Sequence, residues 1–174
     1  MAQTNIYLKL DGIDGESLDE DHQGWIEIDS VAWRTSNDAS YKIGDPGKAK
    51  GGKSQAQVGN ITVTKPCDLS SVTLMRNCVL GSGIASGKIK FLKLKGSEAA
   101  EGLLGQTRVE YLRIELWKIM VSKVEYTGAT EDLKESVELK FTKFKEIYTL
   151  QKNVPGSASG GGDFGWDSET QTPT

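Results

Sequence analysis

The dominant period of hydrophobic side chains along the chain is two. The segments with this alternation are residues 6–10, 25–33, 61–64, 88–94, 109–117, 119–126 and 137–144. A period of two places successive side chains on opposite faces of an extended chain, so each segment is expected to form a half-buried β-strand. The alternation slips between Ile28 and Val31, which predicts a β-bulge near residues 29–30, and a slip between Phe141 and Phe144 predicts a second bulge or a bend.

One segment has helical periodicity instead. Val72, Met75 and Val79 are spaced as neighbours on one face of a helix. Asp68 precedes them where a carboxylate can cap the first turn, and Gly81 follows them where a glycine can close the last turn. The sequence therefore predicts a single short helix between these two residues.

Seven or eight strands and one helix in a chain of 174 residues indicate a mainly β fold. We expect an antiparallel β-barrel with one short α-helix on its flank, because closing a sheet removes the edges that would pair with other chains. This barrel domain is expected to cover residues 1–152.

Two segments differ from the barrel in composition. Residues 36–59 contain five Gly and four Lys with few large apolar side chains, which is typical of a long functional or disordered inserted loop. Residues 153–174 form a Gly/Ser-rich tail that carries Phe164 and Trp166 near its end. A plain linker seldom contains two aromatic side chains so close together, so this aromatic tip is expected to dock on the domain.

The charge balance restricts the class of partner. The chain has 21 basic and 24 acidic residues and a net charge of −3, too balanced for a protein whose main work is to neutralise phosphates. We therefore expect no nucleic-acid partner. Gly47, Gly52, Lys53 and Ser54 match the P-loop pattern G-x-x-x-x-G-K-[ST]. A P-loop needs a buried strand before it and a helix after it, whereas polar chain precedes this motif and a strand follows it. We interpret it as a solvated loop, with nucleotide binding as the alternative.

Catalytic and metal chemistry have little support in the sequence. His22 is the only histidine, which excludes a three-histidine metal site and leaves one candidate base for a Ser-His-Asp system. We interpret His22 as a solvated loop side chain. Cys67 and Cys78 match neither a four-ligand zinc pattern nor a disulfide framework, so both are interpreted as free thiols. No enzymatic activity, cofactor or metal is expected.

Charged residues of opposite sign gather in two loops. The acidic group consists of Asp14, Glu16, Asp19, Glu20 and Asp21. The basic group consists of Lys42, Lys48, Lys50 and Lys53. Complementary patches on one chain favour head-to-tail contacts between identical copies, so these groups are candidates for a stacking contact. The alternative is a pair of ordinary solvated loops.

The first residues and the hydropathy pattern bear on localisation. Residues 1–5 have no basic start and lead straight into the first strand, unlike a signal peptide. No stretch approaches the ~20 apolar residues that a membrane-spanning helix needs. We expect cytoplasmic synthesis, no membrane insertion, and any export to follow a route that recognises the folded or assembled protein.

Short motifs distributed over nearly the whole chain resemble the haemolysin-coregulated protein (Hcp) family, whose members are tube subunits of the type VI secretion system. The segments that carry the resemblance, in order, are residues 6–17, 22–27 (H-x-x-W-I-E), 63–65 with Asp68, Ser71 and Leu74, 110–112, 121–124, 134–143 with Tyr148 and Gln151, and 165–167. Their order and spacing together are fairly specific to this family.

This resemblance implies a β-barrel subunit, of which six copies close into a ring and rings stack into a hollow tube. It also implies a contractile sheath and a spike protein as partners, small effectors in the lumen, and secretion out of the cell or into a target cell. Ser30, Ala32 and Arg34 would face the lumen, and residues 36–59 would reach a neighbouring subunit or ring. We therefore expect a non-enzymatic, self-assembling tube subunit, with a monomeric lipocalin-like ligand-binding barrel as the alternative.

Overall fold

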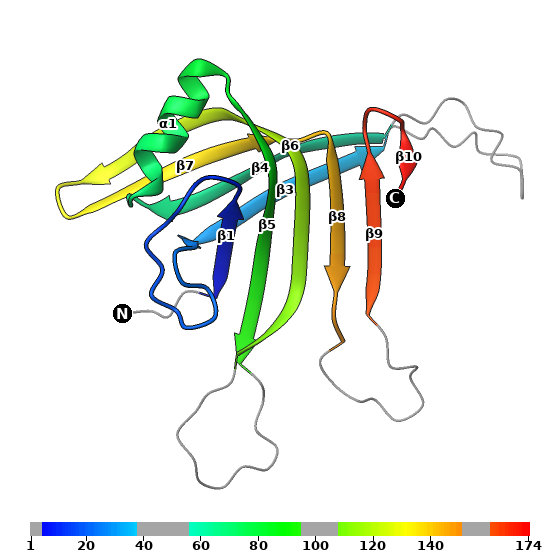
Figure 1. Ribbon diagram of the computed structural model, residues 1–174, viewed down its shortest axis with the longest axis horizontal. Coiled ribbons are helices and arrows are strands. Elements are labelled where there is room, and N and C mark those ends of the chain that lie inside the picture. The colour runs from blue at the N-terminus through cyan, green and yellow to red at the C-terminus, as the bar shows by residue number, and fades with distance from the viewer. Residues whose placement is uncertain (1–4, 38–55, 95–107, 151–160) are drawn as a thin grey trace, which may run out of the picture.

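The computed structural model describes residues 5–37, 56–94, 108–150 and 161–174, and this part contains ten strands and one helix (Figure 1). In chain order the elements are β1 (Ile6–Leu10), β2 (Ile26–Ile28), β3 (Ser30–Asn37), β4 (Ala56–Pro66), α1 (Ser70–Leu80), β5 (Gly83–Leu94), β6 (Arg108–Ala129), β7 (Asp132–Lys140), β8 (Lys143–Tyr148), β9 (Gly162–Asp167) and β10 (Thr172–Pro173). The paired strands are all antiparallel. The predicted mainly β fold with a single short helix is confirmed.

The barrel is a circuit of neighbouring strands. Paired ladders run from β2 through β1, β5, β6, β7 and β4 to β3. The two ends of this run are joined by the chain itself, because Asp29 links β2 to β3 and donates its N–H to the carbonyl of Thr64 at 2.8 Å. The sequence predicted a β-bulge at residues 29–30, but here the chain passes from β2, which pairs with β1, to β3, which pairs with β4. The irregularity in the pairing of β3 with β4 lies further along, between Trp33 and Thr35.

The long strand β6 belongs to both parts of the sheet. Its first half pairs with β5 on one side and β8 on the other, and its second half pairs with β7. Lys118 has a φ of 51°, in the left-handed region, just before the partners change. The alternation pattern predicted separate strands at 109–117 and 119–126, whereas the structure joins them into one bent strand.

The predicted bend before Phe144 separates two strands. β7 ends at Lys140 and β8 begins at Lys143, and the N–H of Thr142 between them donates to the carbonyl of Trp117 at 3.2 Å. Phe144 is buried against the core in spite of its change of phase, because β8 pairs with β6 rather than continuing the ladder of β7.

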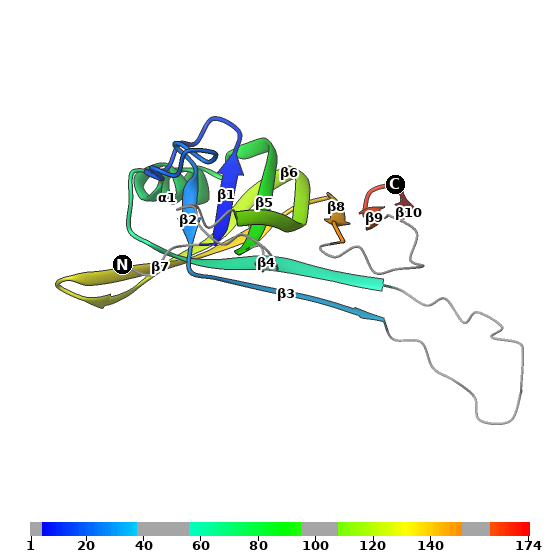
Figure 2. The same ribbon diagram turned by 90° about the horizontal axis from the view of Figure 1, so that it is seen from below.

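The core fills the inside of the barrel with alternate side chains from its strands. The fully buried members include Leu8, Ile26, Ile61, Val63, Ile89, Leu116, Val137 and Leu139. Burying a side chain of this size contributes roughly 1.5–3 kcal/mol, so this cluster provides most of the driving force for folding. α1 packs against β6 on the flank of the barrel (Figure 2).

The aromatic residues of the C-terminal segment lie in β9. This strand pairs with β8, so that Phe164 is opposite Glu146 and Trp166 is opposite Phe144. Trp166 is half-buried against the core, and Phe164 is 54% exposed. The division of the chain at residue 152 stays a prediction.

Candidate assembly surfaces

The outward side of β3, β4, β7 and the second half of β6 forms a surface that we call the polar wall. Across this wall Ser30 on β3 is opposite Thr64 on β4, which is opposite Ser136 on β7. In the same way Ala32 is opposite Thr62, which is opposite Glu138. The positions between them, which include Val31, Val63 and Val137, pack in the core. Figure 2 shows β3, β4 and β7 as one layer along the lower side of the molecule. The outer side of the wall is therefore hydrophilic, with short side chains on β3 and β4 and the charged pair Lys123–Glu125 on β6, and its inner side is apolar.

Glu138 gives the polar wall a fixed negative charge. Its Oε1 accepts hydrogen bonds from Ser122 Oγ at 2.7 Å and from Asn60 Nδ2 at 2.8 Å. These two bonds hold the pKa of the Glu138 carboxyl below its ordinary value, because they stabilise the ionised form. The sequence analysis did not identify Glu138, because it occupies an ordinary polar position in a strand of alternating polar and apolar residues.

The three predicted lumen-facing residues lie on this wall. Ser30, Ala32 and Arg34 are all exposed on β3, and they alternate with Val31 and Trp33, which pack against the core. Trp33 is held in place by its indole N–H, which donates to the carbonyl of Gly59 at 3.0 Å. The side of β3 that bears the three predicted residues therefore points away from the barrel.

The outermost strand at each side of the polar wall has a partner on one side only. Among the described strands, β3 pairs only with β4, and β6 beyond Met120 pairs only with β7. Each such edge presents backbone N–H and C=O groups that can pair with another chain. The wall ends in two different edges, one made by β3 and the other by β6.

The five predicted acidic residues have different surroundings. Asp14 pairs with Lys9 at 2.6 Å, and Glu16 Oε1 accepts the N–H of Leu69 at 2.9 Å, next to the start of α1. The side chain of Asp19 is only 10% exposed and is engaged inside the subunit. Glu20 and Asp21 are exposed. Of the five, these last two present carboxylates that are not engaged elsewhere in the described part of the chain.

His22 is buried, which corrects its interpretation as a solvated loop residue. It is 4% exposed, its ring stacks on Tyr7 with centroids 4.4 Å apart, and its Nδ1 lies 2.7 Å from Asp19 Oδ1. Arg108 forms an ion pair with Asp19 and donates to the hydroxyl of Tyr7 at 2.8 Å. Burial lowers the pKa of His22, the charge of Lys90 lowers it further, and nearby carboxylates oppose the shift. The histidine therefore anchors the acidic loop to β1 and β6.

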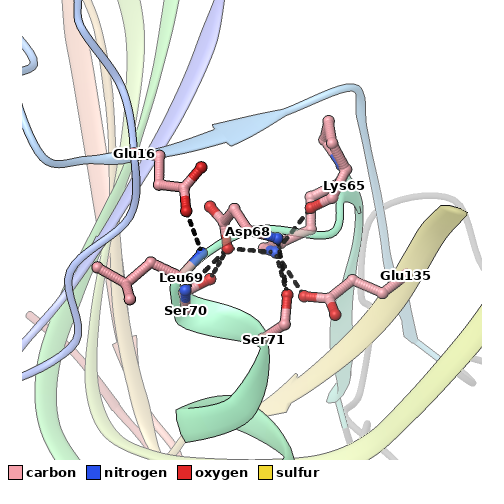
Figure 3. Close-up of polar contacts among 8 residues, drawn as sticks. Glu16, Lys65, Asp68, Leu69, Ser70, Ser71 and Glu135 are labelled. Atoms are coloured by element: carbon pink, nitrogen blue, oxygen red, sulfur yellow. Dashed lines mark hydrogen bonds and ion pairs between the residues drawn. The ribbon is translucent and has the colours of Figure 1, made fainter. Parts of the chain in front are cut away.

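A second buried charge network joins α1 to the wall, as Figure 3 shows. Lys65 on β4 is fully buried, and its Nζ lies 2.5 Å from Glu135 Oε1 on β7 and 2.8 Å from Asp68 Oδ1. Asp68 Oδ1 also accepts the N–H of Ser70 at 2.9 Å, and Ser71 Oγ accepts the N–H of Asp68 at 2.9 Å. Asp68 thus accepts an N–H of the first helical turn, the role that the sequence predicted for it, although Leu69 is the residue at the N-cap position. The pair of Lys65 and Glu135 was missed because β4 and β7 are far apart in the chain.

The outer side of α1 is apolar. Leu69, just before the helix, and Val72, Val79 and Leu80 on it are each more than 60% exposed, whereas Ser70, Ser71 and Leu74 are buried. The helix is confirmed, and Gly81 closes it with a φ of 64°. Two of the three residues whose spacing predicted the helix, Val72 and Val79, point to solvent rather than to the core.

An aromatic groove lies where β3 and β4 pass β8 and β9. It encloses about 530 Å³, and its lining includes Trp33, Val58, Phe144, Phe164 and Trp166 together with the carboxylate-bearing Glu146. The rings of Trp33 and Phe144 meet edge to face, with centroids 4.9 Å apart. The groove is thus a largely apolar surface with a single acidic side chain.

Several predicted residues lie outside the described part of the chain. These are Lys42, Lys48, Lys50 and Lys53, together with the whole P-loop-like motif at 47–54. Cys67 is exposed and Cys78 is half-buried, and both are free thiols. Among the described residues no three His, Cys, Asp or Glu side chains gather as a metal site would require.

The described helix is also too short to cross a lipid bilayer. α1 has 11 residues, and no other helix is present in the described ranges. A helix that spans the hydrocarbon core needs about 20.

Comparisons with known proteins agree on one family. The family described as "Type VI secretion system effector, Hcp" matches residues 7–148 of this chain. Protein hcp1 of Pseudomonas aeruginosa is 28% identical over 165 residues, which cover 94% of each chain. Among solved structures, Hcp1 from Salmonella typhimurium aligns with a TM-score of 0.71 and 25% identity over 97% of each chain. A structure of a type six secretion system protein aligns with a TM-score of 0.79 and 25% identity, over 99% of this chain and 100% of its own. The chain therefore belongs to the Hcp family of type VI secretion proteins.

Proposed function

We propose that this protein is the non-enzymatic structural subunit of the type VI secretion tube. Six copies close into a ring, the rings stack into a hollow tube, and the tube is exported from the cell. The lumen carries small effector proteins, while a contractile sheath surrounds the tube and a spike protein sits at its tip. Membership of the Hcp family supports this reading of the barrel, and the described surfaces suggest how the subunits meet.

The observation that carries the proposal is the polar wall with its two unlike edges. A hydrophilic sheet surface whose outermost strands have no described neighbour on their outer side favours association, because each such strand presents backbone groups that can pair with another chain. Two different edges on one chain make a heterologous contact, which closes into a ring when the rotation between copies divides the circle. The wall then becomes the inner surface of the ring.

The side chains on the wall suit a lumen through which other proteins pass. Ser30, Ala32, Thr62 and Thr64 are short, and they offer few apolar contacts to which a cargo protein would adhere. Arg34 and Glu138 add charges of opposite sign to the same surface. We propose that Ser30, Ala32 and Arg34 contact the cargo weakly, so that an effector is retained in the lumen and then released.

Stacking between rings is assigned to the two charged loops. Lys42, Lys48, Lys50 and Lys53 in the segment 36–59 would face carboxylates of the next ring. Glu20 and Asp21 are assigned as these carboxylates, because both are exposed and form no ion pair in the described part of the subunit. The other three are engaged: Asp14 pairs with Lys9, Glu16 accepts the N–H of Leu69, and Asp19 pairs with His22 and Arg108. The stacking contact is therefore electrostatic and is expected to weaken with added salt.

The test is the assembly state of the purified full chain, measured by negative-stain electron microscopy together with mass photometry. We expect annular particles with six times the chain mass of 18.9 kDa, and stacks of these rings at high protein concentration and low salt. A single-chain mass and no annular particles at high concentration would contradict the proposal. That result would favour the monomeric ligand-binding barrel.

A further inference from the structure

The apolar outer side of α1 is the reverse of what a helix on the flank of a monomer normally shows. A surface helix turns its apolar stripe to the core and its polar side to water. Here Val72 and Val79 are 78% and 76% exposed, and the side that faces the barrel contains Ser70 and Ser71. An apolar stripe exposed in this way indicates a surface that another protein covers.

The stripe carries a single cation. Arg76 is exposed, and it lies one helical turn from both Val72 and Val79, so it belongs to the same side of α1. Within the described part of the chain Arg76 forms no ion pair. The exposed face of α1 is therefore an apolar patch with one positive charge at its centre.

The aromatic groove has the complementary character. Trp33, Phe144, Phe164 and Trp166 provide apolar walls, and Phe164 is more than half exposed. Glu146 lines the same groove from β8, and it too forms no ion pair with a described residue. An apolar patch centred on a cation thus matches an apolar groove that contains a carboxylate.

The two surfaces lie at opposite ends of the subunit. Figures 1 and 2 both show α1 at the end of the molecule where the β6–β7 hairpin projects. The groove lies at the other end, where β3 and β4 pass β8 and β9. α1 packs on β6, whose second half is one edge of the polar wall, and β3, the other edge, lines the groove. Each surface thus lies beside one of the two unlike edges that meet in the proposed ring.

We infer that α1 of one copy docks in the aromatic groove of the neighbouring copy in the ring, with Arg76 of the helix opposite Glu146 of the groove. This inference rests on the proposed ring. The apolar contact supplies most of the binding free energy, because it removes exposed Val, Leu and aromatic surface from water. The charge pair fixes the register, because a misplaced helix would leave both charges without partners in an apolar contact.

A charge-exchange experiment tests the register. Arg76→Glu and Glu146→Arg are each expected to raise the dissociation constant of the ring about tenfold or more, because each places two like charges together. The double variant Arg76→Glu/Glu146→Arg is expected to return to within about threefold of the unmodified protein, since the pair is restored in reverse. Lys88→Glu, at an exposed cation on β5 outside both surfaces, is the matched control and should change nothing. The readout is mass photometry over a dilution series.

A mixing experiment tests the apolar contact. Val72→Asp blocks the helix face and leaves the groove intact, and Phe164→Asp blocks the groove and leaves the helix intact. Alone, each variant is expected to stay monomeric. Mixed in equal amounts, they retain one intact contact and should form heterodimers but no rings. Far-UV circular dichroism and urea unfolding of each variant verify that the monomers remain folded.

The outcomes separate this inference from the proposed function. The inference is supported if the unmodified protein forms rings, each single charge reversal makes the rings less stable, and the double variant restores their stability. Rings that tolerate the single reversals, or that suffer additively from both, overturn it and leave the ring itself intact. Folded Val72→Asp and Phe164→Asp proteins that still form rings also overturn it. Unmodified protein that never forms rings refutes the proposed function as well.

Discussion

The burial of His22 depends on side chains that come from several parts of the chain. Tyr7 on β1 stacks on the imidazole ring, Trp25 meets the ring edge to face, and Asp19 accepts its hydrogen bond. Arg108 at the start of β6 holds Asp19 in position. In its neutral form, His22 carries a proton on Nδ1 and donates it to Asp19, so this site is satisfied without a charge on the ring.

We predict that His22 makes the fold sensitive to acid. Its pKa in the folded state is lowered from 6.5, mainly by burial and then by Lys90, so the unfolded chain binds the proton more readily. This group contributes no pH dependence well above pH 6.5, and it lowers the stability as the pH falls below 6.5 until the folded pKa is passed. Within that window the slope approaches ~1.4 kcal/mol per pH unit.

The measurement is urea unfolding of the native protein and of His22→Asn at pH 7.5 and pH 5.5. The native protein should lose more free energy of unfolding between these two values than the variant, because carboxylates contribute alike to both. An equal loss in the two proteins would show that His22 does not titrate differently on folding.

At the scale of elements, buried charges hold α1 against the sheet. Lys65 connects β4, β7 and the start of the helix, and Glu135 has no other polar partner among the described residues. A buried ion pair stabilises little by itself, but removing one partner leaves the other charged group buried and unpaired. The two members of this pair are not equivalent, because Lys65 also contacts Asp68 and Ser71.

Because Lys65 has more polar partners than Glu135, we predict that substitutions at the two positions lower the free energy of unfolding by different amounts. Lys65→Met leaves Glu135 buried without a partner and also releases Asp68, so it should lower the free energy of unfolding by about 3–5 kcal/mol. Glu135→Gln should cost clearly less, since Lys65 keeps its other contacts. Urea unfolding measures both values. Equal costs would mean that Asp68 and Ser71 do not support the charge of Lys65.

The helix also shows what periodicity can predict. Asp68, Gly81 and the spacing of apolar residues were sufficient to locate α1, because capping and helical spacing act over a few neighbouring residues. The same spacing did not indicate which side faces inward. Val72 and Val79 are exposed although they are the apolar residues, and that orientation is decided by Leu74, Lys65 and the sheet beneath.

At the scale of the whole molecule, the charged loops are expected to govern stacking and not folding. Replacing Lys48, Lys50 and Lys53 together with Glu should leave the barrel and the ring intact but lower ring-on-ring association several-fold, because like charges then meet across the contact. Glu20→Lys/Asp21→Lys should have the same effect, whereas Glu169→Lys, which disturbs an exposed ion pair with Lys118 outside both charged loops, serves as control. Sedimentation velocity at low salt measures the stacks, and undiminished stacking in both variants would refute the electrostatic account.

The sequence by itself determined the class of fold, the single helix and the family. Alternation, capping residues and turn residues are local signals, and the motifs of the Hcp family are spread along the chain, so each could be recognised without knowing which strands are neighbours. It also indicated where the alternation slips, at residues 29–30 and before Phe144.

Only the tertiary structure decided which charges are free and which surfaces are exposed. Asp19 is paired with Arg108, Lys65 with Glu135, and the groove combines residues of β3, β4, β8 and β9. These neighbours are distant in sequence. The local sequence around an acidic loop residue is the same whether its carboxylate is hydrated or paired with an arginine inside the subunit. Burial and pairing arise from the packing of whole strands, which no local pattern encodes.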